Sequence, residues 1–402
     1  MTKPLEGVRV LDLSRVLAGP WATQLLADLG AEVIKVEKPG AGDDTRHWGP
    51  PWLEHGDQKV AAYFLAANRG KRSVAIDIAK EEGAALVRRM AADADVVIEN
   101  FKVGGLRKFG LDAESLRAAN PRLVYASITG FGQDGPYSSR AGYDYIIQGM
   151  GGLMSLTGLP DGEPGGGPMR VGVAVADLFT GMYTANAVLA ALYRREQTGE
   201  GATIDMALLD TQLAMLANQA SNALVGGTDP RRQGASHPNI VPYQPFDAHD
   251  QPIIIAVGND GQFARLAAIL GHAEWVEDPA FATNAARVAA REKLVPMIAE
   301  IIATKTASSW LEELEEAGIP AGPINTISQA LADPQAIYRG ARLDVGGGAL
   351  GNVPMVGSPI RIDGERSDAS LPPPALGEHG SLLLEWIDAA EIERLKASGI
   401  LG

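Results

Sequence analysis

Short apolar runs alternate with helical patterns along the first third of the chain, and this alternation constrains the fold more than any other feature. The segment VRVLDLS (8–14) has the pattern of a short strand, and PWATQLLADLG (20–30) has helical spacing and ends in glycine. AEVIKVEKPG (31–40) reads as a second strand. A strand, a helix and a strand in this order form a βαβ unit, which joins parallel strands.

The alternation continues through four further segments. Residues 72–78 and 95–101 read as strands on either side of a helical pattern at 81–94, and residues 121–132 form another strand. Together these segments predict an α/β fold with a mostly parallel, doubly wound sheet. Ligands bind such sheets at the carboxyl ends of the strands, so functional residues are expected in the loops that follow strands.

A second, smaller domain is expected further along the chain. The segment 151–170 is rich in glycine and proline and reads as a surface loop, and a long helix follows at about 178–196. A linker with Gly, Pro and His occupies 226–242, and 243–325 alternates strands and helices on a smaller scale. The sequence therefore predicts a domain boundary at this linker.

Composition excludes several kinds of chemistry. The 402-residue chain has no cysteine, which removes thiol nucleophiles, disulfides and thiolate metal sites. Its six histidines are scattered without ligand spacing, so no metal site is expected. There is no Walker phosphate loop, no HExxH and no G-x-S-x-G motif, so the chemistry of those motifs has no support.

Net charge limits the expected partners. The formal charge of −14 at pH 7 disfavours nucleic acid and anionic membranes, and an anionic substrate would need locally placed cations. The first residues lack the basic and apolar segments of a signal peptide, and no apolar run reaches the ~20 residues of a membrane helix. We therefore expect a cytoplasmic protein, which the absence of cysteine also fits.

Two loops after predicted strands combine unusual residues. SRVLAGP (14–20) can hold an anion on backbone N–H groups and a helix N-terminus, or it is a simple turn. EKPGAGDDTRHWGPPW (37–52) places Lys38, Arg46, His47 and two tryptophans in a loop with several glycines and prolines. Such a loop suits a ligand lid or a structural tryptophan contact.

Two further loops carry cations or an aromatic side chain. NRGKRS (68–73) has three cations within four residues, which suits a nucleotide phosphate or a solvated turn. ENFKVGGLRKFG (99–110) ends a strand with Asn100 and Phe101, which suits stacking on a base or is an ordinary strand end. Together the four loops indicate sites for a polyanionic, adenine-bearing ligand.

A lone carboxylate, Asp177, follows the small apolar run VGVAVA and begins a helical pattern. Taken by itself, it reads as a helix cap. Taken with the four loops, it is also a candidate catalytic group on a strand-to-helix junction. The residues alone leave both interpretations open.

Ten segments, in family order, resemble the class III coenzyme A transferases of the CaiB/BaiF type. They are LDLSRVLAGP, GAEVIKVEKPGAGDDTR, NRGKRS, VIENF, SITGFGQDGP, RAGYD, VAVADLFTGMYTANAVLAAL, NIVPYQPF, GIPAGPIN and PPALGEH. The resemblance implies a coenzyme A thioester as substrate, no tightly bound cofactor, and Asp177 as the nucleophile.

The resemblance also implies the assembly. Each chain of the family forms an open ring, and two chains interlock as a homodimer. A Rossmann-like large domain is built from both ends of the chain, with a small α/β domain inserted between them. Residues 1–225 would form the N-terminal part of the large domain, 226–325 the linker and small domain, and 326–402 the return linker and the C-terminal part.

A mechanism and a CoA site are implied in the same way. Asp177 attacks the acyl-CoA thioester, the released thiolate returns to form an aspartyl-CoA thioester, and the acceptor carboxylate then collects the CoA. Lys71 and Arg72 are plausible phosphate partners. The positions expected to hold CoA are Arg15, Val16, Leu17, Ala18, Lys38, Asn100, Phe101, Arg107 and Tyr143.

Two departures bear on the branch of the family. The consecutive glycines of the formyl-CoA branch are replaced by VGNDGQ (257–262), and the proton-transfer His of the related 2-methylacyl-CoA racemases is replaced by Tyr143, a poor base near neutrality. The chain is most similar to the succinyl-CoA:dicarboxylate, glutarate-like branch. A distal carboxylate would then need a cation, and Arg46, Arg170 and His237 are the candidates. A racemase and an inactive acyl-CoA-binding protein are the alternatives.

Overall fold

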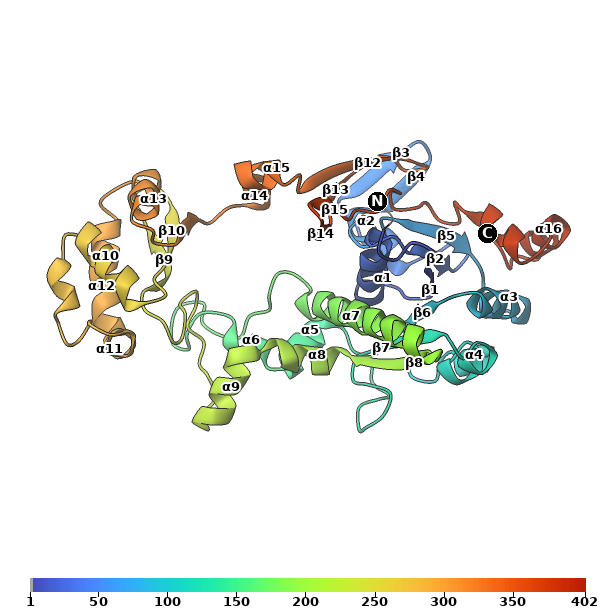
Figure 1. Cartoon of the computed structure of the whole chain (residues 1–402), viewed down its shortest axis with the longest axis horizontal. Coiled ribbons are helices and arrows are strands. Elements are labelled where there is room, and N and C mark those ends of the chain that lie inside the picture. The colour runs from blue at the N-terminus through green and yellow to red at the C-terminus, as the bar shows by residue number, and fades with distance from the viewer. Residues whose placement is uncertain (1–2) are drawn as a thin grey trace. The chain divides into compact units, whose positions relative to one another are not determined.

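The computed structural model describes residues 3–402, which fold into two compact units. The larger unit contains the chain up to Leu153 together with Val171–Val225 and Pro334–Gly402. The smaller unit contains Met154–Arg170 and Gly226–Asp333. The C-terminal segment thus returns to the unit in which the chain begins (Figure 1).

Six strands of the described chain form one sheet in the larger unit, and every neighbouring pair in it is parallel. The order β5-β2-β1-β6-β7-β8 means that the chain starts in the middle, builds one edge and then builds the other (Figure 1). This is the strand order of dinucleotide-binding folds, and it reverses between β1 and β6. The strands are β1 (Arg9–Asp12), β2 (Glu32–Glu37), β5 (Lys71–Ala75), β6 (Val96–Glu99), β7 (Val124–Thr129) and β8 (Ala202–Ala207).

Helices cover both faces of this sheet, which confirms the predicted doubly wound architecture. Val10 and Leu11 are successive residues of β1 and lie in two different hydrophobic cores, because side chains alternate along a strand. The Leu11 core is closed by α3 (Glu81–Ala92), α4 (Ala113–Ala119) and α16 (Ala389–Ala397). The Val10 core is closed mainly by α1 (Ala18–Asp28), α5 (Asp144–Met150), α7 (Val175–Thr198) and α8 (Leu208–Met215).

The helix α7 is long and apolar enough, by length and composition alone, to cross a membrane, with a mean hydropathy of 1.3. The sequence analysis expected no segment of this kind. In the structure α7 packs along α1 and against β7 and β8. We therefore interpret it as a core helix of the α/β unit.

Antiparallel hairpins and short helices complete the larger unit. The β3–β4 hairpin and the helix after it share a small core with the β12–β13 hairpin, where Phe64 and Val353 are buried. These elements are β3 (Trp52–His55), β4 (Gln58–Ala61), α2 (Ala62–Leu65), β12 (Arg342–Gly348), β13 (Gly351–Val356), β14 (Arg361–Ile362), β15 (Glu365–Arg366), α9 (Ala217–Gly226), α15 (Pro334–Tyr338), and the 3-10 helices η1 (Asp44–His47), η2 (Arg107–Phe109) and η4 (Gly380–Glu385).

The smaller unit has one antiparallel sheet in the order β11-β10-β9, packed on helices. Its core includes Phe263, Ile298 and Trp310, all buried, and the indole N–H of Trp310 donates to the carbonyl of Ile302. The elements are β9 (Tyr243–Asp247), β10 (Pro252–Ala256), β11 (Ala321–Pro323), α6 (Leu153–Leu156), α10 (Asp260–Ile269), η3 (Ala273–Val276), α11 (Asn284–Ala289), α12 (Arg291–Ile302), α13 (Ala307–Glu316) and α14 (Ile327–Ala332).

The unit boundaries differ in part from the predicted ones. The smaller unit begins again at Gly226, as the expected linker does, but it extends to Asp333 and not to residue 325. It also takes in Met154–Arg170, which the sequence analysis assigned to the large domain. The reason is a set of contacts with the linker: the Gly234 N–H donates to the Gly158 carbonyl, and Arg232 pairs with Asp161.

Candidate active site

Asp177 lies inside the first turn of α7. The helix begins at Val175, and its N-cap is Ala174, which makes no side-chain capping hydrogen bond. Asp177 is therefore the third helical residue and not the cap that the sequence left as one possibility. Its side chain is partly buried, and within residues 3–402 its carboxylate forms no hydrogen bond or ion pair.

The carboxyl of Asp177 has a pKa well above that of an ordinary aspartate. Burial, together with the nearby negative charge of Asp144, raises its pKa from 3.8 to about 7. An unpaired, poorly hydrated carboxylate is a stronger nucleophile than one in water, because less solvent must be displaced before it attacks. The position is thus suited to covalent catalysis.

Close packing of α7 on α1 sets where this carboxylate lies. A Cβ atom at Gly181 would lie only 2.7 Å from the carbonyl oxygen of Ala18, so no larger residue fits there without displacement. Ala18 is the first residue of α1, and Gly181 follows Asp177 by about one helical turn. Asp177 is therefore close to the N-terminus of α1 and to the loop after β1.

The loop after β1 is fastened to the loop after β6, at the point where the strand order reverses. The Arg15 N–H donates to Oδ1 of Asn100 at 2.9 Å, and Nδ2 of Asn100 donates to the Arg15 carbonyl at 2.6 Å. Val16 follows with φ of 72°, an unusual value for a β-branched residue. Ligands of doubly wound sheets bind in this crevice, so the loop is held in a functional location.

A buried ion pair holds this loop against the sheet. The Val16 N–H donates to the carboxylate of Asp43, which also lies 3.0 Å from the ammonium of Lys35. Lys35 Nζ donates to the Ser14 carbonyl at 2.8 Å. Since Lys35 and Asp43 are both buried, the pair anchors the strained turn at Val16 to β2.

A pocket of about 270 Å³ opens at the carboxyl ends of β1, β2, β5 and β6. Three residues that the sequence analysis assigned to CoA, Arg15, Lys38 and Phe101, line it together. The Arg15 guanidinium lies 5.4 Å from the centre of the Phe101 ring. The other lining residues are Leu13, Val36, Glu37, Gly42, Asp43, Ile76, Asp77, Ile78, Ala79 and Phe109. The pocket joins an aromatic and aliphatic wall to two cations, which suits a nucleotide.

Lys71 does not reach this pocket, which corrects its expected role as a phosphate partner. Its side chain is fully buried, and Nζ donates to Asp12 at 3.0 Å, to the Pro20 carbonyl and to Asn68. Although burial opposes ionisation, the Lys71 and Lys35 charges hold the pKa of Asp12 well below its usual range. Lys71 is therefore an internal counter-ion of β1.

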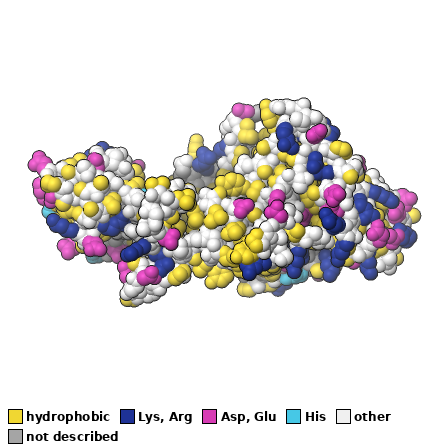
Figure 2. Space-filling view, turned by 90° about the horizontal axis from the view of Figure 1, so that it is seen from below, with side chains coloured by type: hydrophobic (Ala, Val, Ile, Leu, Met, Phe, Trp, Pro, Cys, Tyr) yellow, Lys and Arg dark blue, Asp and Glu magenta, His cyan; other side chains and the backbone are white. Residues whose placement is uncertain are grey.

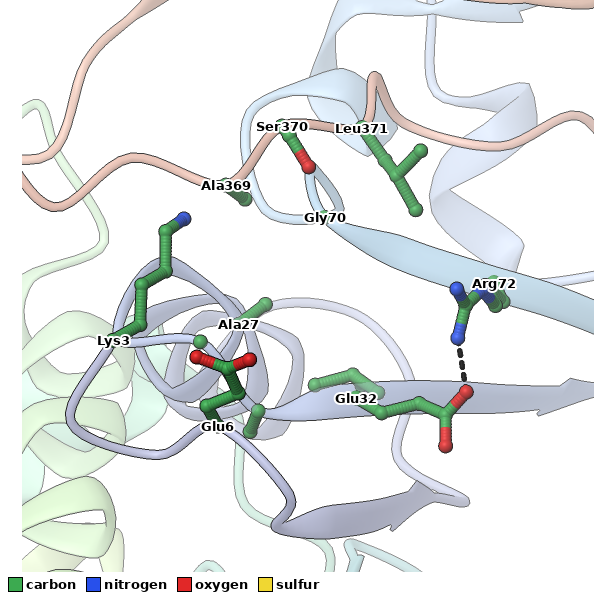
Figure 3. A pocket seen from close by; sticks show the side chains of 12 residues that line it. Lys3, Glu6, Ala27, Glu32, Gly70, Arg72, Ala369, Ser370 and Leu371 are labelled. Atoms are coloured by element: carbon green, nitrogen blue, oxygen red, sulfur yellow. Dashed lines mark hydrogen bonds and ion pairs between the residues drawn. The ribbon is translucent and has the colours of Figure 1, made fainter. Parts of the chain in front are cut away.

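Arg72 is also directed elsewhere. It pairs with Glu32 at the start of β2 and lines a separate cavity of about 380 Å³ (Figure 3). This cavity lies at the amino ends of β2 and β5, the opposite edge of the sheet from the site. Lys3 and Glu6 approach it from the N-terminal segment, and Ala369 and Ser370 from the C-terminal segment. Arg72 therefore does not line the pocket at the carboxyl ends of the strands.

Arg46 is not a free cation either, which corrects its expected role at an acceptor carboxylate. It is buried, and its guanidinium binds both carboxylate oxygens of Glu37, at 2.8 and 2.6 Å. It also donates to the Pro374 carbonyl and stacks on Phe64 at 3.7 Å. These contacts use its donors to join the loop after β2 to the C-terminal segment.

The remaining predicted residues lie in several places. Leu17 is the N-cap residue of α1, and Arg107 begins η2 near the nucleotide pocket, with an exposed side chain. Tyr143 precedes α5 and is 60 % exposed. Arg170 and His237 belong to the smaller unit; Arg170 is exposed, and the His237 ring lies 5.2 Å from that of Tyr243.

The structure adds neighbours of Asp177 that sequence reasoning missed. Burial raises the pKa of the Tyr63 hydroxyl, and so do the charges of Asp177, Asp144 and Asp43, which places Tyr63 near the site. Trp48 meets Tyr63 edge to face at 5.3 Å. The only signal in the sequence for this group was the tryptophan-bearing loop, because Tyr63 and Asp144 come from separate helices.

No cluster of three or more His, Asp or Glu residues suited to a metal ion occurs in the described part of the chain.

Comparison with known proteins relates nearly the whole chain to the CoA-transferases of family III. The sequence model of CoA-transferase family III matches residues 5–380. The chain is 52 % identical to Succinate–glutarate CoA-transferase of Agrobacterium fabrum, with 96 % of each chain covered. It is 41 % identical to human Succinyl-CoA:glutarate CoA-transferase, covering 99 % of this chain and 90 % of that one. A crystal structure of a CaiB/BaiF family protein from Brucella suis superposes with a TM-score of 0.85 at 51 % identity, covering 98 % of this chain and 100 % of that chain.

Proposed function

The chain belongs to CoA-transferase family III and is a CoA-transferase, and from this premise we propose which substrates and which intermediate it uses. We propose that it moves CoA from succinyl-CoA to a dicarboxylic acid such as glutarate, through a CoA thioester on Asp177. Relatives at 52 % and 41 % identity carry names for succinate or succinyl-CoA with glutarate, which supports this substrate pair. The observation that supports this covalent intermediate is the unpaired, partly buried carboxylate of Asp177.

The reaction balances without a redox step or a net proton. An Asp177 oxygen attacks the thioester carbonyl carbon, the carbon–sulfur bond breaks, and a mixed anhydride and CoA thiolate result. The thiolate attacks the Asp177 carboxyl carbon and expels succinate, which leaves the CoA thioester on Asp177. The acceptor carboxylate repeats these two steps in reverse order, so that its acyl-CoA leaves and free Asp177 is restored.

The surroundings of Asp177 favour each attack. Burial and the Asp144 charge raise the pKa of its carboxyl to about 7, so the ionised form is basic and weakly hydrated. The residues before it, Val173, Ala174 and Val175, offer no side-chain hydrogen bond to compete with the substrate. Backbone N–H groups at the start of α1, which α7 approaches at Gly181, are proposed to stabilise the oxyanions.

The CoA nucleotide is proposed to occupy the pocket at the reversal of strand order. Phe101 and Ile78 would pack on the adenine, and Arg15 and Lys38 would neutralise the phosphates. The pantetheine arm would then pass the fixed turn at Val16 to reach Asp177. The close approach of α7 to α1 at Gly181 supports this path, since it brings the nucleophile to the same loop.

The acceptor's distal carboxylate still needs a cation. Arg46 is paired with Glu37, and Arg170 and His237 stay proposals for this role, as the sequence suggested them. An acid with one more or one fewer methylene would be discriminated only modestly, by roughly 10- to 200-fold.

An interlocked homodimer is proposed as the working assembly. Exposed apolar side chains gather on α5, α7, α8 and α9, and Figure 2 shows apolar side chains on the side of the larger unit seen from below. Monomeric proteins rarely expose so many on adjoining helices. The residues are Tyr145, Ile146, Met150, Phe179, Met182, Tyr183, Tyr193, Leu213, Leu224 and Val225. Light scattering should give twice the chain mass of 42.2 kDa.

The substrate pair is tested by incubating the protein with succinyl-CoA and one acid from a series of mono- and dicarboxylates, and quantifying each new acyl-CoA by mass spectrometry. We expect glutaryl-CoA to form fastest, and Asp177→Asn to lower the rate by at least about 10³-fold. Transfer to monocarboxylates alone would overturn the acceptor class. Full activity in Asp177→Asn would overturn the nucleophile.

A further inference from the structure

We propose that Asp144 is a positioning residue of the reaction, which fixes the turn that carries Asp177 and faces that carboxylate with a like charge. The inference rests on the proposed function, in which Asp177 is the nucleophile. Asp144 begins α5 and is only 8 % exposed, so it is a buried carboxylate next to the reacting one. Asp144 itself is expected to form no bond with the substrate.

The first contact of Asp144 is with the backbone just before Asp177. Its Oδ1 accepts the N–H of Ala176 at 2.9 Å. The first N–H groups of a helix have no partner within the helix, and the N-cap Ala174 provides none. Asp144, a residue of α5, therefore caps the N-terminus of α7. It fixes the peptide unit between Val175 and Ala176, one residue before Asp177.

The second contact extends the clamp through Gln148, one turn later on α5. Oδ2 of Asp144 accepts from Nε2 of Gln148 at 2.8 Å, and Oε1 of Gln148 accepts the Val171 N–H at 2.9 Å. Gln148 is fully buried. The two side chains thus hold the segment from Val171 to Ala176 at both of its ends, immediately ahead of the nucleophile.

The charge of Asp144 acts on Asp177 in addition to this clamp. It adds like-charge repulsion to the effect of burial, and among residues 3–402 no cation opposes the resulting rise in the Asp177 pKa. Asp144 also takes the Ala176 N–H, a helix N-terminal donor that could otherwise stabilise an ionised Asp177. The other ionisable groups that face the pair are Tyr63 of α2 and, beyond it, Asp43.

Two variants separate the clamp from the charge. Asp144→Asn removes the charge and keeps an oxygen for the Ala176 N–H, but its amide nitrogen replaces the acceptor of Gln148 Nε2. Gln148→Leu removes that same contact and the link to Val171 and leaves the charge in place, so an effect seen only in Asp144→Asn reports the charge. Asp144→Glu keeps the charge and displaces it by one methylene. Asp388→Asn is the matched control, because Asp388 caps α16 on the exposed surface.

The experiment is single-turnover formation of the CoA adduct on Asp177, measured by intact-protein mass with succinyl-CoA between pH 5 and 9. We expect Asp144→Asn to move the acid midpoint of the rate down by about 0.5–1 pH unit, because the like charge is gone. Gln148→Leu should slow adduct formation by about 3- to 30-fold with the midpoint unchanged. Asp388→Asn should match the wild type.

An unchanged midpoint in folded Asp144→Asn overturns the charge role, and an unchanged rate in Gln148→Leu overturns the clamp. If Asp144→Asn does not fold, Asp144→Glu provides the test. The proposal then requires slower adduct formation with the wild-type pH midpoint. A shifted midpoint in Asp144→Glu would contradict it. Absence of any adduct in the wild type is a different outcome, since it overturns the proposed covalent function itself.

Discussion

Asn100 and Arg15 exchange two hydrogen bonds, at 2.9 and 2.6 Å, across the point where the strand order of the parallel sheet reverses. The side chain of Asn100 thereby satisfies both the backbone N–H and the backbone carbonyl of Arg15, in the loop after β1. Because Val16 comes next with φ of 72°, this bridge sits beside the most unusual backbone of the site.

Replacing Asn100 by Leu should loosen this loop without opening the core, since the contact is at an exposed edge. Loss of two hydrogen bonds of roughly 1 kcal/mol each should raise KM for succinyl-CoA by about 5- to 30-fold. Steady-state kinetics with varied succinyl-CoA measure this. A KM within twofold of the wild type would contradict a role for the bridge in CoA binding.

Phe101→Leu tests the proposed adenine contact. Leucine keeps an apolar side chain but loses the flat ring, which contributes about 1–3 kcal/mol when a base stacks on it. We expect a KM for succinyl-CoA at least about 5-fold higher, and a smaller effect with succinyl-pantetheine, which lacks the nucleotide. Equal effects with both thioesters would place the nucleotide elsewhere.

Two lysines of the expected CoA site should behave in opposite ways. Lys38→Met removes an exposed pocket cation, so KM for succinyl-CoA should rise while the free energy of unfolding stays within about 0.5 kcal/mol. Lys71→Met leaves Asp12 buried without its counter-ion and should cost about 3–5 kcal/mol of stability. Urea denaturation of both variants measures this, and a stable Lys71→Met with a raised KM would contradict the structural assignment.

Asp177→Asn should stabilise the fold in a pH-dependent way. The unfolded carboxyl ionises near 3.8 and the folded one near 7, so between these values the folded state binds more protons and stability falls as pH rises. The variant avoids this loss. With allowance for solvent at a partly exposed group, its gain at pH 8 should be on the order of 1–3 kcal/mol.

Urea titrations at pH 4.5 and pH 8 compare the variant with the wild type at each pH. The difference should be much larger at pH 8, and Asp388→Asn serves as the control for removing a carboxylate from a helix N-terminus. A difference that is the same at both pH values would contradict an elevated pKa for Asp177.

Most of the central sheet could be predicted from sequence because its inner strands are apolar on both faces and are separated by helical patterns. The edge strand β8 was not predicted, since its residues alternate between partly buried and exposed. The pattern placed β1, β2, β5, β6 and β7 correctly, and these strands end at the predicted ligand loops. The β3–β4 and β12–β13 hairpins were missed, because their half-exposed strands lack a continuous apolar run. Each hairpin pairs locally, and the two meet only in a small shared core that no sequence pattern records.

The residues proposed for CoA lie together where they sit in loops that follow strands. Arg15, Lys38 and Phe101 line one pocket, and their binding of CoA stays a prediction. Lys71 and Arg46 looked the same in the sequence, yet each pairs with a buried acid. Lys71 pairs with Asp12, 59 residues away, and Arg46 pairs with Glu37, nine residues away. Asp144 was missed because its role depends on the packing of α5 beside α7, and no motif within either helix records that contact.

The most direct test of the account is the intact mass of the protein after mixing with succinyl-CoA, before and after hydroxylamine, with Asp177→Asn alongside. The account predicts a hydroxylamine-sensitive adduct of CoA mass on the wild type, located on Asp177 by peptide mapping and discharged by glutarate. No adduct, or the same adduct on Asp177→Asn, would contradict transfer through this carboxylate.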